Sequence, residues 1–261
     1  MPSIVFPLEI EETILDLLAE DDELHEGHSA LKACSLVCQA FLPICRKHIF
    51  ASIAINDRVT VSQRSPPTIH SHAFERLLRE TPEIADYIRK LDFSCEITNF
   101  TNPSIQESLK RISRLEFLTV RHHLDWRNNP IRPALLHLLH LPTLTHFNMI
   151  NMTNFVVSDL SPCVNLKYLD IDHYTTVAAE TTFPAALPEH SIQLNEFVAG
   201  IESSAVAMKL CTTRRPDGQS IIDFGSLFKI TIAFKGYDDG EALQELFKRC
   251  HVLTNVHISC K

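Results

Sequence analysis

The sequence predicts an α/β protein in which a small all-helical N-terminal module precedes a curved solenoid with a parallel β-sheet. Two observations lead to this prediction. The first 50 residues hold short amphipathic segments with helix start signals. Farther along, one apolar pattern recurs seven times with helical segments between its copies. We expect residues 1–55 to form the helical module, 56–71 a linker and 72–261 the solenoid of about seven strands.

The first helix is expected to begin at Pro7, whose missing N–H would be unpaired there anyway. Glutamates at 9, 11 and 12 favour the positive end of its dipole. Apolar residues repeat at helical spacing on two faces, one with Ile10, Ile14, Leu17 and Leu18 and the other with Leu8 and Leu15.

Two more short helices should follow. Ser29 is placed to cap the second, which we expect to end or kink near Phe41 or Leu42 because Pro43 comes next. The third runs through Ile44 to Phe50. A core built from about 50 residues is marginal by itself, so a partner would supply the missing burial.

These segments resemble the F-box, the module that docks a substrate receptor onto the Skp-type adaptor of cullin-RING ubiquitin ligases. The resemblance covers residues 5–50 and rests on "FPLEIEETILDLL" and "LKACSLVCQAF" in that order. The loop between Leu18 and Leu31 is longer and more acidic than is usual, and Phe41 stands where many members have tryptophan. The residues that the resemblance implies face or support the adaptor are Pro7, Leu8, Ile14, Leu15, Leu31, Val37 and Phe41.

The solenoid prediction comes from apolar residues at offsets 0, +3 and +5. Their seven copies start at Ile88, Leu115, Leu144, Leu166, Leu194, Leu227 and Leu253. The spacings of 27, 29, 22, 28, 33 and 26 residues lie around the period of roughly 20 to 29 that is typical of leucine-rich repeats. The asparagine or cysteine of regular repeats is absent at offset +8. The stretch from Phe74 to Leu91 instead resembles the degenerate repeats that follow F-boxes in mushroom-forming fungi.

Offsets +2, +4 and +6 should point away from the core, because side chains alternate along a strand. We expect them to line the concave face and to bind a target protein there. Aromatic residues and arginine often anchor interfaces. The candidates for target binding are Phe117, Arg121, His146, Tyr168 and Asp170.

The sequence favours a non-catalytic substrate receptor of the SCF type, with no cofactor. The alternative is a repeat-only interaction scaffold whose N-terminal helices cap the first repeat. An enzyme comes third, because no phosphate loop or hydrolase elbow occurs, and His137, His140, Cys34 and Cys38 lack the spacing of a metal site.

Charge and composition disfavour some classes of binding partner and some cellular locations. A formal charge of -8 argues against nucleic acid and anionic membranes as partners. The N-terminus has acids where a signal peptide is basic, and no apolar run reaches the length of a membrane span. We expect a cytoplasmic or nuclear protein whose eight cysteines stay reduced.

Overall fold

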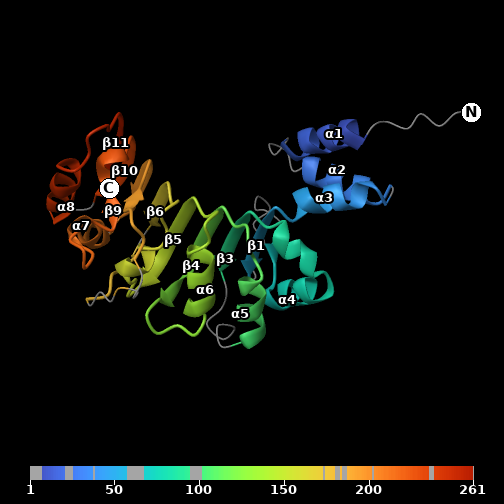
Figure 1. Cartoon of the computed structure of the whole chain (residues 1–261), viewed down its shortest axis with the longest axis horizontal. Helices are drawn as coiled ribbons and strands as arrows, with labels where there is room; N and C mark the ends of the chain where they lie inside the picture. Colours follow the sequence, from blue (N-terminus) through green and yellow to red (C-terminus); the bar gives the residue numbers. More distant parts are fainter. Residues whose placement is uncertain are drawn as a thin grey trace, which may run out of the picture.

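The N-terminal part of the chain folds as three short helices (Figure 1). The computed structural model describes residues 8–20, 26–37, 39–57, 68–94, 102–172, 174–179, 183, 187–201, 203–234 and 238–260. In this part of the chain α1 spans Leu8–Glu20, α2 spans Glu26–Ser35 and α3 spans Phe41–Ile49. Pro7, which we expected to begin the first helix, lies outside the described residues.

A small core holds the three helices together. Leu15, Leu31 and Cys45 are its buried members, and Leu18, Ala19, Cys34, Phe41, Ile44 and Ile49 pack around them. The prediction that Pro43 ends the second helix is wrong, because α2 already ends at Ser35 and Pro43 is the third residue of α3. Proline is tolerated in the first turn, where N–H groups have no acceptor within the helix.

A nine-stranded sheet forms the larger part of the described structure (Figure 1). Its order is β11-β10-β8-β6-β5-β4-β3-β1-β2, and all neighbouring strands are parallel. The strands are β1 (Ser52–Asn56), β2 (Thr68–Ile69), β3 (Lys90–Ser94), β4 (Phe117–Asp125), β5 (His146–Thr153), β6 (Tyr168–Asp172), β8 (Glu196–Ala199), β10 (Lys229–Phe234) and β11 (Asn255–Cys260). The predicted α/β class with a parallel sheet is confirmed.

Offsets +3 and +5 of each apolar triplet fall within one of the strands β3, β4, β5, β6, β8, β10 and β11, and offset 0 lies two residues before that strand. The triplet residues point into the core, as Leu118 and Val120 of β4 show by their complete burial. Val256 and Ile258 of β11 differ, since both remain about half exposed. Strands β1 and β2 were not predicted, and β1 joins the sheet directly after α3 by pairing with β3.

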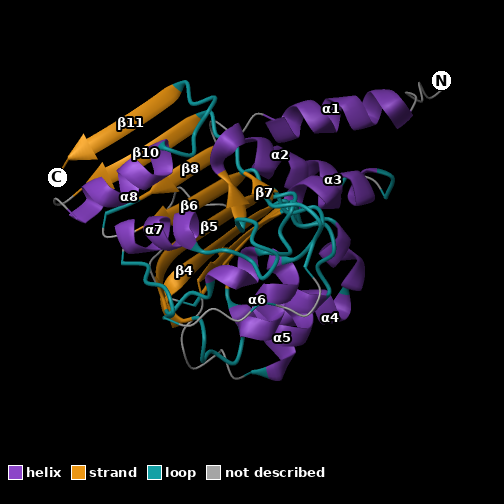
Figure 2. Cartoon of the chain, turned by 60° about the vertical axis from the view of Figure 1, so that its left-hand side comes forward, coloured by secondary structure: helices purple, strands orange, loops and turns teal. Residues whose placement is uncertain are grey.

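Helices cover the core side of the sheet (Figure 2). They are α4 (Ser71–Glu80), α5 (Pro103–Lys110), α6 (Arg132–Leu139), α7 (Ser204–Thr212) and α8 (Asp238–Phe247), with short 3-10 helices η2 (Pro82–Asp86), η4 (Val157–Leu160) and η5 (Phe224–Ser226). The buried side chains of the helices and of the strands form one core, in which Leu135 of α6 and Phe147 of β5 are both included. We call the opposite side of the sheet the open face.

The chain on both sides of β8 departs from the repeating order of strand and helix. Two short strands, β7 (Ile192–Gln193) and β9 (Ile222–Asp223), pair with each other in a separate small sheet. The buried Arg215 lies in the turn between α7 and β9 and bonds to the chain ahead of β7. This arrangement accounts for the longer distance along the chain, 33 residues, between the starts of the fifth and sixth triplets.

Candidate functional site

A row of stacked rings crosses the open face. Phe117 on β4, His146 on β5 and Tyr168 on β6 occupy the same register position on adjacent strands. Their ring centroids are 4.0 Å apart between Phe117 and His146 and 5.4 Å apart between His146 and Tyr168. Lys90 on β3 places its Nζ 5.0 Å from the centroid of Phe117, within the range of a cation–π contact. We call Phe117, His146 and Tyr168 the ring ladder.

The environment of the ring ladder favours the neutral forms of His146 and Tyr168. Burial lowers the pKa of His146, with Lys90 acting in the same direction and Glu196 and Glu116 opposing. Burial also raises the pKa of the Tyr168 phenol to about 12, and the carboxylates of Asp170 and Glu196 add to the shift. Both rings are therefore predominantly uncharged near pH 7.

Acidic side chains continue from the ladder along β6. The Tyr168 hydroxyl donates to Asp170 Oδ2 at 3.4 Å, and Asp172 follows at the next outward position. Tyr174, just beyond the strand, has a positive φ of 51° and a side chain that is 58% exposed. A bulky residue in that conformation is uncommon and signals local constraint. We call Tyr168, Asp170, Asp172 and Tyr174 the β6 patch.

Arg121 takes a different position from the other predicted target-binding residues. It lies farther along β4 than Phe117, and its Nε donates to both carboxylate oxygens of Asp92 on β3, at 2.9 and 3.0 Å. Burial raises the pKa of Asp92, while the Arg121 guanidinium acts to lower it. The sheet thus brings together four of the five predicted residues, Phe117, His146, Tyr168 and Asp170, and holds Arg121 in an ion pair beside them.

Three side chains of this region were absent from the predicted target-binding set. Asp172 carried a signal, since offset +6 marked it as outward. Glu196 of β8 lies in register with Tyr168, and it forms an ion pair with Lys229 of β10 at 2.8 Å. Tyr174 follows the end of the regular alternation, so its position could not be read from the strand period.

A second candidate site is apolar and lies on the N-terminal helices. Ile10, Ile14 and Leu17 of α1 and Leu36 and Val37 after α2 have side chains that are 45% to 86% exposed. Of the predicted adaptor-binding residues, Ile14 and Val37 belong to this apolar face. Leu15 and Leu31 are buried beneath it and Phe41 is half-buried. Leu8 is the first residue of α1, and its side chain lies outside the description.

The histidines considered as metal ligands form hydrogen bonds to the backbone instead. His137 Nε2 lies 3.3 Å from the Ile112 carbonyl oxygen, and His140 Nε2 lies 2.8 Å from that of Asp159. No cluster of three or more His, Cys, Asp or Glu side chains that could hold a metal ion occurs in the described ranges.

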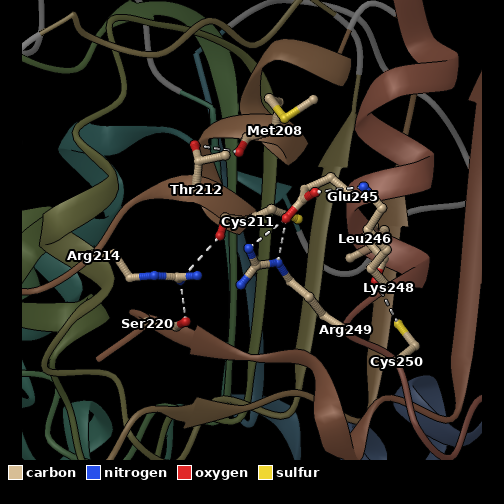
Figure 3. A network of polar contacts seen from close by, with 10 residues as sticks. All are labelled: Met208, Cys211, Thr212, Arg214, Ser220, Glu245, Leu246, Lys248, Arg249 and Cys250. Carbon is tan, nitrogen blue, oxygen red and sulfur yellow. Dashed lines mark hydrogen bonds and ion pairs between the residues drawn. The ribbon is translucent and has the colours of Figure 1, made fainter. Parts of the chain in front are cut away.

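The cysteines with resolved pKa shifts have the properties of structural thiols. Figure 3 shows Cys211 on α7 near Arg249, whose guanidinium is held by Glu245 of α8 at 2.6 Å. Burial raises the pKa of Cys211 to about 12 in spite of the opposing charge of Arg249. Burial also raises the pKa of Cys163 and of Cys250. These three thiols therefore remain protonated and are weak nucleophiles at pH 7.

No protein-family model, curated protein or solved structure matches this chain. Within the described residues, none of the helices combines the length and the apolarity required for crossing a lipid bilayer.

Proposed function

We propose that this chain is a substrate receptor of a cullin-RING ubiquitin ligase. In this proposal the N-terminal helices form an F-box that binds a Skp-type adaptor, and the repeats form a solenoid that holds a target protein. The chain would contribute binding and orientation to ubiquitin transfer and would carry no catalytic group of its own.

The exposed apolar face of the helices carries the proposal. Five large apolar side chains stand in solvent on a module whose own buried core has Leu15, Leu31 and Cys45 as its members. Exposed apolar side chains that cluster on one side of a helix are typical of a protein interaction site. Ile10, Ile14 and Leu17 follow one another at helical spacing, so they can enter a partner's groove as one ridge.

The alternative, in which the helices cap the first repeat, is supported by a few contacts between the end of α3 and the rest of the structure. Arg46 of α3 lies 3.7 Å from Glu83 of η2, and Phe50 packs against the core of the sheet. These contacts fix the end of α3 beside the sheet. They leave Ile14, Leu17 and Val37 exposed, and a cap would be expected to bury such residues.

Copurification with a Skp-type adaptor tests the proposal. We expect a complex at micromolar protein concentration, and Ile14→Glu should weaken it by about 2 kcal/mol or more by placing a charge in an apolar interface. Ser29→Glu adds the same charge at an exposed position of α2 and serves as the control. The absence of any complex with the unaltered chain at micromolar concentration would refute the proposed function.

Substitutions at two adjacent residues of α1 allow effects on adaptor binding and on folding to be measured separately. Ile14 is 52% exposed whereas Leu15 is 2% exposed. Ile14→Glu should therefore leave thermal unfolding nearly unchanged, while Leu15→Ala should destabilise the helices by about 2–4 kcal/mol. Weaker adaptor binding that appeared only together with unfolding would count against a direct contact by Ile14.

A further inference from the structure

Strand β11 forms one edge of the nine-stranded sheet (Figure 2). Its six residues pair with β10 in unbroken register, and within the described part of the chain no strand lies on its outer side. Proteins protect sheet edges with short strands, charged residues, prolines or bulges. The opposite edge has such protection, because β2 is only two residues long. By contrast, β11 contains no lysine, arginine, acidic residue or proline, and its register shows no bulge.

The core side of β11 is also uncovered. Val256 and Ile258 are 49% and 48% exposed, whereas the residues in register with them on β10, Ile230 and Ile232, are 0% and 7% exposed. An unpaired strand edge and two exposed apolar side chains therefore occur at the same place. This combination is typical of an edge to which another strand adds.

The direction of the backbone groups along β11 follows from one hydrogen bond. The Asn255 N–H donates to the Phe228 carbonyl oxygen at 2.9 Å, so the backbone groups of Asn255 point toward β10. Successive residues of a strand point these groups to alternate edges. The N–H and C=O groups of Val256 and Ile258 therefore point to the outer edge, where an added strand could bond to them.

The strand is complementary to a second copy of itself. An antiparallel pair about a two-fold axis at His257 sets Val256 of each copy opposite Ile258 of the other. Both residues have outward backbone groups, so each such pair can exchange two hydrogen bonds while the apolar side chains meet on the core side. On the open face Asn255 would lie opposite Ser259, and the two His257 side chains would be neighbours. Apolar residues thus meet apolar residues, and polar residues meet polar ones.

The charges near β11 do not oppose this pairing. Lys248 and Arg249, which follow α8, both form ion pairs with Glu245, at 3.5 and 2.6 Å. A two-fold contact also stops at the dimer, because it uses the same edge of both copies. Pairing of β11 with β2 of another copy would leave free edges and continue into a filament, but β2 offers only two residues for it.

We propose that β11 pairs antiparallel with β11 of a second copy of this chain and forms a two-fold dimer with one continuous sheet. Both helical layers lie on one side of that sheet, and both open faces lie on the other. The contact is small, so the dissociation constant should be on the order of 10 µM. This inference goes beyond the proposed function and is independent of it, because the dimer requires neither the adaptor nor a target.

Sedimentation velocity of the full chain between about 1 and 300 µM tests the proposal. We expect conversion of monomer to dimer without larger species. Ile258→Lys should raise the dissociation constant at least about tenfold, because it places a charge on the pairing edge. Ile10→Lys makes the same change on α1 at a side chain that is 45% exposed, and it should alter the constant by less than about twofold. A chain that stays monomeric at every concentration would overturn the proposal.

A cysteine substitution tests the register. His257→Cys puts two thiols across the axis in a directly opposed pair whose Cα atoms lie about 4.5 Å apart, a separation that a disulfide can span. Asn255→Cys is the control, because the two copies of residue 255 would be about 13 Å apart. Oxidation with copper phenanthroline should crosslink His257→Cys, while Asn255→Cys should remain at the level of the unaltered chain. Peptide mass spectrometry identifies the linked residues, and equal linkage at 255 and 257 would overturn this register.

Two further comparisons make the outcome decisive. Circular dichroism selects the variants that fold, and Val256→Lys together with the His257→Cys crosslink gives the result if Ile258→Lys does not fold. Dimers lost in Ile10→Lys but retained in Ile258→Lys would overturn the proposal, because they would form through the apolar face of the N-terminal helices. Dimers retained in both variants would also overturn it and would leave the β11 edge to a strand of a different protein.

Discussion

Asp159 connects two elements on the helical side of the sheet. It accepts a hydrogen bond from Trp126 Nε1 at 2.7 Å and two from Arg132 Nη2, at 2.7 and 3.0 Å. Trp126 is fully buried, and its indole N–H has no access to water to replace this acceptor. A single carboxylate thus satisfies a buried donor and pairs the first residue of α6 with η4.

Replacing that carboxylate should be costly. Asp159→Ala leaves the Trp126 N–H and the Arg132 guanidinium without this acceptor, and we expect the free energy of unfolding to fall by about 2–4 kcal/mol. Urea denaturation measures the change. Glu107→Ala on the exposed side of α5 is the control and should have an effect of less than about 0.5 kcal/mol. Equal denaturation midpoints for the two variants would contradict this role of Asp159.

The lowered pKa of His146 links stability to pH. Its pKa is below the ordinary value of 6.5 in the folded state, so the unfolded chain binds the proton more tightly. This contribution to stability is complete above the unfolded pKa and is lost as pH falls through the folded pKa. Lys90, Glu116 and Glu196 supply the charges around the ring.

The variant His146→Phe keeps a ring in the ladder and removes the titrating group. We expect its free energy of unfolding to fall less than that of the unaltered chain between pH 7.5 and pH 5, because the other titrating groups are common to both. Chemical denaturation at several pH values gives the two slopes. A steeper acid loss in His146→Phe would show that the sign of the linkage is wrong.

At the scale of elements, apolar spacing predicted seven strands and the side of the sheet to which their residues point. The same offset +2 in three triplets put Phe117, His146 and Tyr168 in one row, because the neighbouring strands are in register at these positions. The pair of Arg121 and Asp92 was not foreseen, since the two residues occupy different offsets. Strand β1 was missed although Ile53 and Ile55 alternate, because it is short and follows a helix directly.

The irregular loops that precede and follow β8 are joined by one buried cation. Arg215 donates from Nη1 to the His190 carbonyl at 3.2 Å and from Nη2 to the Pro188 carbonyl and to Asp217, at 2.5 and 2.6 Å. The sequence did not reveal this function, because "TTRRPDGQS" has the composition of a solvated turn. Burial and three oxygen partners show that Arg215 fastens two loops that are 25 or more residues apart.

Arg215→Ala should release this connection. We expect the free energy of unfolding to fall by about 2–4 kcal/mol, because the carbonyls of Pro188 and His190 lose their donor. Proteolysis between Pro188 and Ser191 should also become faster. Arg76→Ala at an exposed position of α4 is the matched control. Limited proteolysis followed by mass spectrometry locates the first cleavage. A first cleavage outside residues 187–223 in the Arg215→Ala variant would argue against this function.

At the scale of the whole molecule, the described residues form two hydrophobic cores. The boundary between them lies a few residues before the one predicted from the sequence. The module core of Leu15, Leu31 and Cys45 is separate from the core of the sheet. Phe50 packs against the sheet core, and β1 lies wholly in the sheet. The boundary between the helical module and the sheet therefore lies near Phe50. This is earlier in the chain than the linker that we expected to begin at residue 56.

Two truncations test this division and separate the receptor from the capped scaffold. A chain that begins at Phe50 keeps β1 and should fold, because the buried residues of the sheet core all lie within it. A chain that begins at Asp57 loses Ile53 and Ile55, which are almost completely buried, and leaves β3 with an unpaired edge. We expect the second truncation to lower the denaturation midpoint sharply relative to the first. Cooperative unfolding of the Phe50 chain, without adaptor binding, would support an independent docking module. Loss of its cooperative transition would instead show that the helices cap the sheet and that adaptor docking is not their main purpose.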